Sequence, residues 1–134
     1  MTRFEFFVCA ALCVTLPAAP AMAHHSFAAE FDGNKPITKK GFVTKIAWMN
    51  PHVWIYVDVK NEDGTVANWG FEMGAPHALQ SVGWTRGMLK PGDEVIVDGW
   101  LAKNKPNNGN ARTVTMASTG QQLGAVSSAG QTPP

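Results

Sequence analysis

The chain has 134 residues, of which 11 are basic and 10 acidic, and its formal net charge is +1. This near-neutral balance, with no basic patch and no run of like charge, argues against nucleic acid as a partner. A chain of this length forms one domain, and such a domain buries enough apolar surface to fold without covalent cross-links.

Residues 1–23 are typical of a secretory signal peptide. Arg3 gives the amino terminus positive charge, an apolar run follows from Phe6 to Leu16, and Ala21-Met22-Ala23 closes the segment. A basic start, a short apolar core and a small-x-small site are the three parts of such a signal. The run is shorter than the roughly 20 apolar residues that a membrane helix needs. We therefore expect cleavage after Ala23, a periplasmic or secreted protein, and no membrane span afterwards.

Both cysteines of the chain, Cys9 and Cys13, lie within this leader. The mature chain of 111 residues that remains after removal of 23 has no cysteine, so it can form neither a disulfide nor a thiolate metal site. Because export normally permits disulfides, this domain must be held together by its core.

The mature chain divides into three parts. Residues 24–40 are expected to form an N-terminal segment that docks on the domain, and residues 41–119 the domain itself. Residues 120–134 are expected to be a disordered tail, because the last stretch consists almost entirely of Ser, Ala, Gly, Gln, Thr and Pro.

Hydrophobic alternation predicts a domain built of strands. It is clearest where Val53, Ile55 and Val57 alternate with polar and aromatic residues. Pro at a turn, Gly-rich loops and polar loops separate the candidates. The five predicted strands are Gly41–Met49, His52–Val59, Val66–Met73, Asp93–Ala102 and Ala111–Ala117.

The turn between the second and third strands fixes their register. Asn61-Glu62-Asp63-Gly64 is typical of a type I turn followed by a left-handed Gly, so Asn61 should face Thr65. Counting back puts apolar pairs on one face, which must be the core, and a mixed set on the other. The core pairs are Val57–Trp69, Ile55–Phe71 and Val53–Met73; the opposite pairs are Tyr56–Gly70, Trp54–Glu72 and His52–Gly74.

A short helix is predicted between the third and fourth strands. Pro76 suits the first turn of a helix, and Gly83 should end it. Three strands, a helix and two strands are the order of an OB-type barrel. The predicted fold is therefore all-β, a small five-stranded OB-type barrel with one short helix between strands three and four. An open sandwich of five or six strands is the alternative.

Several motifs resemble those of a known family. The segments are His24-His25-Ser26-Phe27-Ala28-Ala29-Glu30-Phe31-Asp32, Trp48-Met49-Asn50-Pro51-His52, Gly83-Trp84-Thr85-Arg86 and Pro91-Gly92-Asp93. Together they are similar to a family of small secreted bacterial proteins classed as a domain of unknown function. The resemblance covers nearly the whole mature chain and implies an exported single domain, but no activity.

The histidines suggest a copper site. Cleavage after Ala23 makes His24 the first residue, so that its amine and its ring Nδ1 can chelate one metal ion, as in a histidine brace. His52 is the choice for a second imidazole, since Gly74 opposite leaves room for it, with His77 or His25 as a further ligand. Planar nitrogen ligation suits Cu(II), and a metal ion can displace the proton of an α-amine at neutral pH.

Other interpretations of these histidines remain open. His24 and His25 can belong to a frayed terminus, His52 can hydrogen-bond the Asn50-Pro51 turn, and His77 can be solvated on its helix. Phe27 and Phe31, four residues apart, can dock the N-terminal segment on the barrel or belong to the ordinary core.

An exposed aromatic face is the alternative site. Trp54 and Tyr56 share the non-core face of the second strand, next to Glu72 on the third. Such faces of OB-type barrels bind oligosaccharides or single strands, so the alternative function is an interaction module for a glycan or a periplasmic protein. Phe27, Phe31 or the helix could instead cover these rings.

No group of residues points to catalysis. The sequence has no nucleophile with a neighbouring base, no close pair of carboxylates and no phosphate or dinucleotide loop. We expect a binding protein rather than an enzyme, and no cofactor other than copper.

Overall fold

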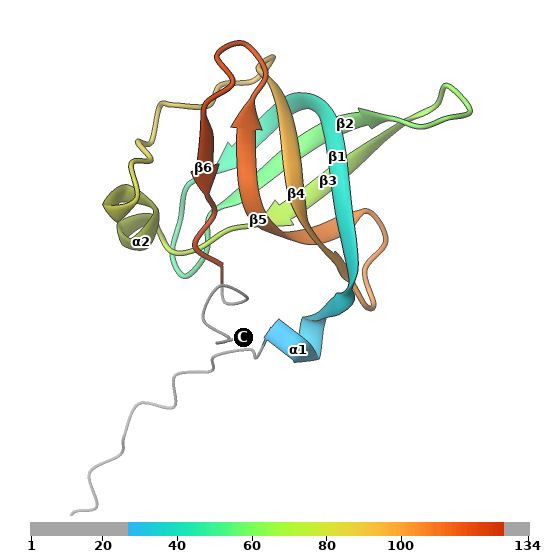
Figure 1. The fold of residues 1–134 in the computed structure, drawn as a ribbon, viewed down its shortest axis with the longest axis horizontal. Helices are drawn as coiled ribbons and strands as arrows, with labels where there is room; N and C mark the ends of the chain where they lie inside the picture. Colours follow the sequence, from blue (N-terminus) through green and yellow to red (C-terminus); the bar gives the residue numbers. More distant parts are fainter. Residues whose placement is uncertain (1–26, 128–134) are drawn as a thin grey trace, which may run out of the picture.

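The computed structural model describes residues 27–127 and shows a mostly β fold (Figure 1). Two short helices flank or interrupt the strands, and none of the described helices is long and apolar enough to cross a membrane. The elements, in chain order, are α1 (Phe27–Glu30), β1 (Phe31–Ala47), β2 (Trp54–Lys60), β3 (Val66–Glu72), α2 (Pro76–Ser81), β4 (Glu94–Ala102), β5 (Asn108–Met116) and β6 (Gln122–Gly124).

Strands β1 to β5 close into a ring, as expected for the OB type. Strand β1 is antiparallel to both β2 and β4, β2 to β3, and β4 to β5, while β3 and β5 close the ring as a parallel pair. The short helix α2 lies between β3 and β4, as predicted. Strand β6 adds a sixth member beside β5.

The long strand β1 serves two neighbours (Figure 1). Its first part pairs with β4 and its last part with β2, and Gly41 pairs with both, facing Val59 on one side and Val95 on the other. A Cβ atom on Gly41 would overlap the carbonyl group of Asp58, so this crossing point requires glycine.

The predicted register of β2 and β3 is confirmed from Trp54–Glu72 to Lys60–Val66. The ladder ends there, so the predicted pairs Val53–Met73 and His52–Gly74 are not part of it. Val57 faces Trp69 and Ile55 faces Phe71. The turn has the expected form, since Asn61 N donates to Thr65 O at 2.8 Å and Gly64 has φ of +87°. Because a shift of one residue would exchange the faces, this register decides which side chains form the core.

The core lies inside the ring and under α2. It consists of the inward side chains of the strands together with Leu79 from α2 and Trp84 and Leu89 from the following loop. The fully buried members include Val53, Ile55, Val57, Phe71, Met73, Val95, Val97 and Val114.

Strand β1 begins ten residues earlier than predicted, at Phe31 instead of Gly41. Residues 31–40 therefore belong to the barrel, where Pro36 faces Trp100 and Ile37 faces Gly99. The polar run Asp32 to Lys35 hides this from the sequence, because it falls at an irregularity of the β1–β4 pairing between Phe31 and Pro36 and shows no alternation.

The prediction of a disordered tail from residue 120 is wrong for residues 122–127. Strand β6 pairs with β5, and Ala125 and Ser127 are buried. The Trp84 indole N–H donates to Gly124 O at 2.9 Å, and Gly74 N donates to Ala125 O at 2.8 Å. Composition cannot reveal this, because these contacts use the backbone of small and polar residues.

Candidate functional site

The site lies on the outer face of the barrel, where β2, β3 and β5 meet. Successive side chains of a strand point to opposite faces. Because Ile55 and Phe71 point into the core, their neighbours Trp54 and Glu72 point outward, and the two residues face each other across β2 and β3. The sequence therefore predicted this pair, but not its surroundings.

Glu72 and His52 lie at the centre of the site. Glu72 Oε2 lies 3.6 Å from His52 Nδ1, within the range of an ion pair. The Glu72 side chain is 9% exposed and that of His52 is 36% exposed, so the carboxylate is enclosed and the ring can be reached from solvent. Burial raises the pKa of the Glu72 carboxyl, and the His52 ring opposes this shift by favouring the charged form.

Asn110 completes an outward row of polar side chains. It faces Glu72 in the parallel pair and Trp100 in the antiparallel pair. Its side chain is fully buried, and its Nδ2 donates to Glu72 Oε1 at 3.4 Å, while its Oδ1 has no partner among the described residues. The sequence reasoning missed Asn110, because it placed this residue in a polar loop and began the fifth strand at Ala111.

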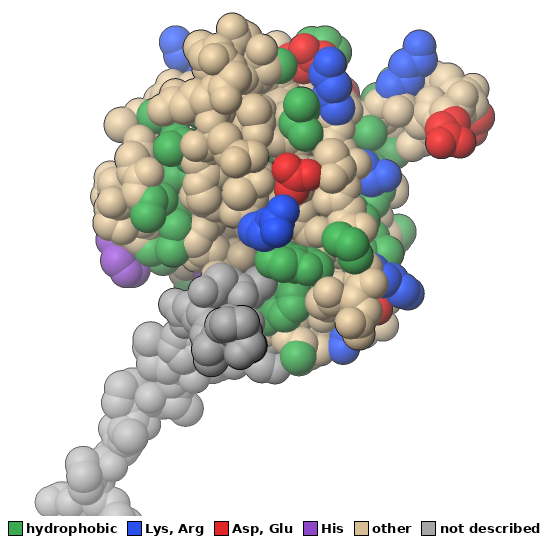
Figure 2. Space-filling model, viewed as in Figure 1, with side chains coloured by type: hydrophobic (Ala, Val, Ile, Leu, Met, Phe, Trp, Pro, Cys, Tyr) green, Lys and Arg blue, Asp and Glu red, His purple; other side chains and the backbone are tan. Residues whose placement is uncertain are grey.

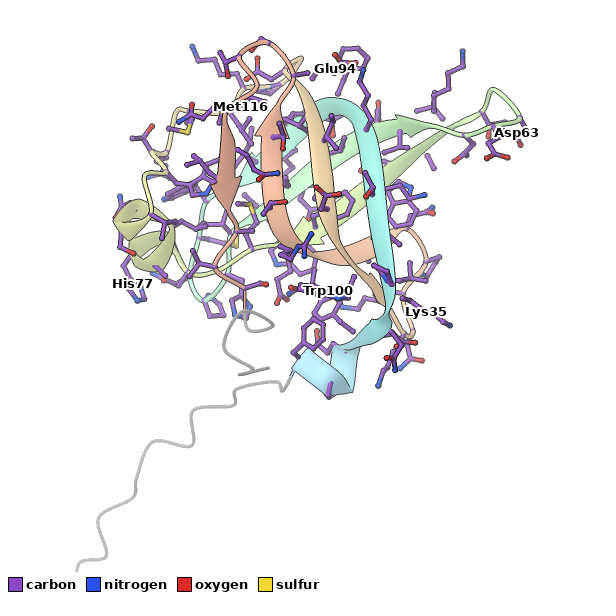
Figure 3. All side chains as sticks on the ribbon, in the orientation of Figure 1. Lys35, Asp63, His77, Glu94, Trp100 and Met116 are labelled. Carbon is purple, nitrogen blue, oxygen red and sulfur yellow. The ribbon has the colours of Figure 1, made fainter. Side chains whose placement is uncertain are left out.

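Helix α1 packs on this part of the outer face. The Phe27 ring stacks on that of Phe31 at 5.6 Å and meets the edge of Trp100 at 5.3 Å. Lys103 fastens the helix to the strand end, since its N donates to Glu30 O at 2.9 Å and its Nζ to Ala28 O at 2.5 Å. Figure 3 shows Trp100 beside α1.

A pocket of about 180 Å³ opens between α1, β2 and the loop from β4 to β5. Its lining includes the aromatic residues Trp54 and Phe31 and the polar residues Glu30, Lys105 and Asn108. Trp54 lines this pocket and faces Glu72 across β2 and β3, so the pocket and the His52–Glu72 pair are neighbours. The full lining is Ala29, Glu30, Phe31, Trp54, Ala102, Asn104, Lys105 and Asn108.

Trp54 and Tyr56 are half-buried and lie side by side. Their rings stack with centroids 6.5 Å apart, and Lys45 Nζ lies 5.5 Å from the Tyr56 centroid. Of the possible covers, Phe27 packs on Trp100, and Phe31 lines the pocket together with Trp54. Trp54 therefore retains an accessible surface within the pocket.

Charge on the surface is mixed. On the face drawn in Figure 2, the described acidic and basic side chains are interspersed, and hydrophobic side chains gather over the ends of β1 and β4 beside α1. This distribution agrees with the near-neutral composition and gives no continuous basic surface on this face.

Among the described residues, the structure does not bring another predicted metal ligand together with His52. His77 lies exposed on α2 (Figure 3). No three His, Cys, Asp or Glu side chains within residues 27–127 come together as a metal-binding group. The prediction that Gly74 leaves room for His52 is wrong. The backbone of Val126 fills this space, since a Cβ atom on Gly74 would overlap its carbonyl group. His24 and His25 lie outside the described residues.

The fold and this pocket define the class of the protein: a small OB-type β-barrel with a partly buried polar site on its outer face. The chain belongs to the Family of unknown function (DUF6152), whose model matches residues 11–112. This confirms the expected membership in a family of unknown function. No curated protein and no solved structure matches the chain.

Proposed function

We propose that this is an exported copper-binding protein whose metal site begins at the mature N-terminus. The His24 amine and ring nitrogen supply two ligands and His52 supplies the next, with His25 or His77 as a further ligand. The observation that carries the proposal is the pairing of His52 with the buried Glu72.

The His52–Glu72 pair has the arrangement of a metal-binding imidazole and its supporting carboxylate. Metal-ligating histidines commonly donate one ring N–H to a carboxylate, which fixes the ring and makes the other nitrogen a better ligand. Here Glu72 Oε2 lies at 3.6 Å from Nδ1, so Nε2 is the nitrogen left for a metal ion. Asn110 in turn holds the other carboxylate oxygen of Glu72.

The path of the chain favours delivery of His24 to this place. Helix α1 begins at Phe27, three residues after His24. Three residues of extended chain reach roughly 10 Å. Glu30, at the end of α1, lines the same pocket as Trp54, which is two residues from His52. A described chain that begins at Phe27 and lines this pocket at Glu30 supports the proposal that His24 can reach the His52–Glu72 pair.

The ligand chemistry favours Cu(II). An amine and two imidazoles form a planar nitrogen set, which suits Cu(II), and Cu(II) also has the highest affinity among the divalent first-row ions. The amine must lose its proton, and its ordinary pKa of about 8 allows a metal ion to displace that proton near neutral pH. Because the described residues alone hold no three-ligand group, this site depends on the N-terminal residues.

The test is Cu(II) electron paramagnetic resonance on the secreted protein, with its N-terminus verified by mass. We expect one copper per chain and an axial spectrum with nitrogen couplings. Addition of one alanine before His24 should change the spectrum, since it moves the amine away from the ring that must chelate with it. His52→Gln should remove one nitrogen coupling, and Glu72→Gln should lower copper affinity by roughly 10- to 100-fold.

His77→Gln tests whether His77, an exposed histidine on a separate helix, is the further ligand. An unchanged spectrum would leave His24, His52 and His25 as the ligand set, and a lost coupling would add His77 to it. Identical spectra with and without the added alanine, or weak copper binding in both samples, would reject the N-terminal site.

A further inference from the structure

The pocket beside α1 is held in shape by contacts within the described chain. Lys103 joins α1 to the end of β4 through its backbone and its side chain. In the loop that leads into β5, Asn108 Nδ2 donates to Pro106 O at 2.9 Å, and Gly70 N donates to Asn107 O at 3.0 Å. Both rims of the pocket are thus tied to strands, so the pocket is preformed rather than created by a ligand.

One wall is an aromatic platform. Trp54 lines the pocket and stacks on Tyr56, which supports it from the side. Gly70 allows the neighbouring polar wall to approach, since a Cβ atom there would stand 3.0 Å from Asn108 Oδ1 and 3.3 Å from Tyr56 Cε1. An indole and an amide therefore border the same small volume.

The other walls are polar and balanced in charge. Glu30 supplies a carboxylate and Lys105 an ammonium group, while Asn104 and Asn108 supply amides. A strongly anionic or cationic ligand would face one like charge, whereas a neutral ligand with several hydroxyl groups meets both donors and acceptors. The volume of about 180 Å³ is below the usual range of drug-sized pockets and suits a single ring.

We propose that this pocket binds one neutral sugar ring, at the end of a glycan. The Trp54 face packs against the C–H face of the ring, and the amides and charged groups bind its hydroxyl groups. The pocket opens to solvent, which leaves room for the rest of the glycan. OB-type barrels bind oligosaccharides on the β2–β3 face and the β4–β5 loop, and this pocket is built from β2 and the β4–β5 loop; that agreement is an analogy between folds.

The proposal is independent of the copper site. It uses described residues of the pocket and requires neither His24 nor a metal ion. Sugar binding measured in the presence of a chelator therefore tests this proposal separately from the copper site.

The experiment is a titration of the mature protein, with a chelator present, followed by tryptophan fluorescence and by amide NMR shifts. The probes are the methyl glycosides of glucose, galactose, mannose and N-acetylglucosamine, and an oligothymidylate for comparison. We expect saturable shifts centred on Trp54 and Asn108 with at least one glycoside. A single small ring should bind with millimolar affinity. Trp54→Ala should abolish the shifts, and Trp54→Phe should retain part of the binding.

Lys105→Ala and Lys60→Ala form a matched pair, because both side chains are exposed and Lys105 alone lines the pocket. Lys105→Ala should weaken binding several-fold and Lys60→Ala should leave it unchanged. Saturable shifts for none of the four glycosides would overturn the proposal. Tighter binding of the oligothymidylate would overturn the proposal in favour of a nucleic-acid ligand. Shifts centred away from Trp54 would overturn it in favour of a different binding surface.

Discussion

The interior of the barrel and the polar row on its outer face are built from the same strands but stabilised differently. Inside, Ile55 and Phe71 face each other among apolar side chains and are almost fully buried. In the adjacent pair of this antiparallel ladder, Trp54 and Glu72 face each other on the outside, where Glu72 is also buried and accepts a hydrogen bond from Asn110 of β5. Burial inside is favourable, whereas burial of the outer carboxylate opposes its ionisation.

We infer that the inner pair contributes to stability, whereas the buried Glu72 serves function. A well-packed apolar pair contributes to stability wherever it lies, but a buried carboxylate beside a histidine is costly and persists where it orients a ligand or binds one. Substitutions on the two faces of the same strand pair should therefore act in opposite directions.

The largest effect is expected inside the barrel. Phe71→Ala should lower the free energy of unfolding by about 3–5 kcal/mol, because it removes a fully buried ring and leaves a cavity. The matched control is Phe42→Ala, since Phe42 is 54% exposed and its loss should change stability by less than about 1 kcal/mol. Chemical denaturation of both variants measures the difference. Equal effects would show that the ring of strands does not enclose the core described above.

The second-largest effect is expected at Gly99, where β4 passes close to the backbone of Asn110 on β5. Gly99 faces Ala111, and a Cβ atom there would overlap the backbone carbonyl of Asn110. Gly99→Ala should therefore cost roughly 1–3 kcal/mol, because the backbone beside the polar row must shift. Gly124→Ala serves as control, since a Cβ atom at Gly124 meets no neighbouring atom within 4 Å. Thermal unfolding of the two variants should differ; similar melting temperatures would contradict the close approach.

Glu72→Gln should stabilise the protein at neutral pH, by roughly 1 kcal/mol. The folded-state pKa of Glu72 is raised above its ordinary value of 4.5, so its contribution is most favourable below pH 4.5 and is lost as pH rises through the raised pKa. The amide does not ionise and avoids this loss. Denaturation measured from pH 4 to pH 7 should show a gain that grows with pH.

The contrary outcome is informative as well. If Glu72→Gln destabilises the protein at pH 7, attraction between Glu72 and His52 outweighs the cost of burial. A gain in stability together with weaker copper binding would show that Glu72 is kept for the site rather than for the fold.

The sequence predicted the interior better than the outer site for a physical reason. Alternation of Val53, Ile55 and Val57 and the turn at Gly64 determine the inward face and the register locally. The same register placed Trp54 beside Glu72. It could not show that Glu72 is buried, because its cover comes from chain segments far away in sequence.

Three residues of the outer site could not be predicted from the sequence. Asn110 lies in a polar stretch without alternation, and its burial depends on the parallel pairing of β3 with β5. Glu30 and Lys105 come together because Lys103 binds the end of α1, a contact between residues more than seventy positions apart. Glu30 does lie within the motif that begins at His24, and this was the one signal available for it.

The smallest effect is expected at the tip of the β2–β3 hairpin, where an exposed carboxylate contrasts with Glu72. Asp63 Oδ1 accepts hydrogen bonds from the Thr65 hydroxyl at 2.6 Å and from Thr65 N at 2.9 Å, and these bonds lower the pKa of Asp63 below 3.8. Its contribution to stability is present above pH 3.8 and is lost as pH falls through the lowered pKa.

An NMR titration of the Thr65 amide should therefore have its midpoint below pH 3.8. Thr65→Val removes the hydroxyl, which makes the larger contribution, and should move the midpoint of Asp63 back toward its ordinary value. A midpoint at or above 3.8 in the unmodified protein would contradict the hydrogen bonds at this turn. Opposite shifts at Asp63 and Glu72 would show that hydrogen bonds control the ionisation of the exposed carboxylate at the turn, whereas burial controls that of the enclosed carboxylate on β3.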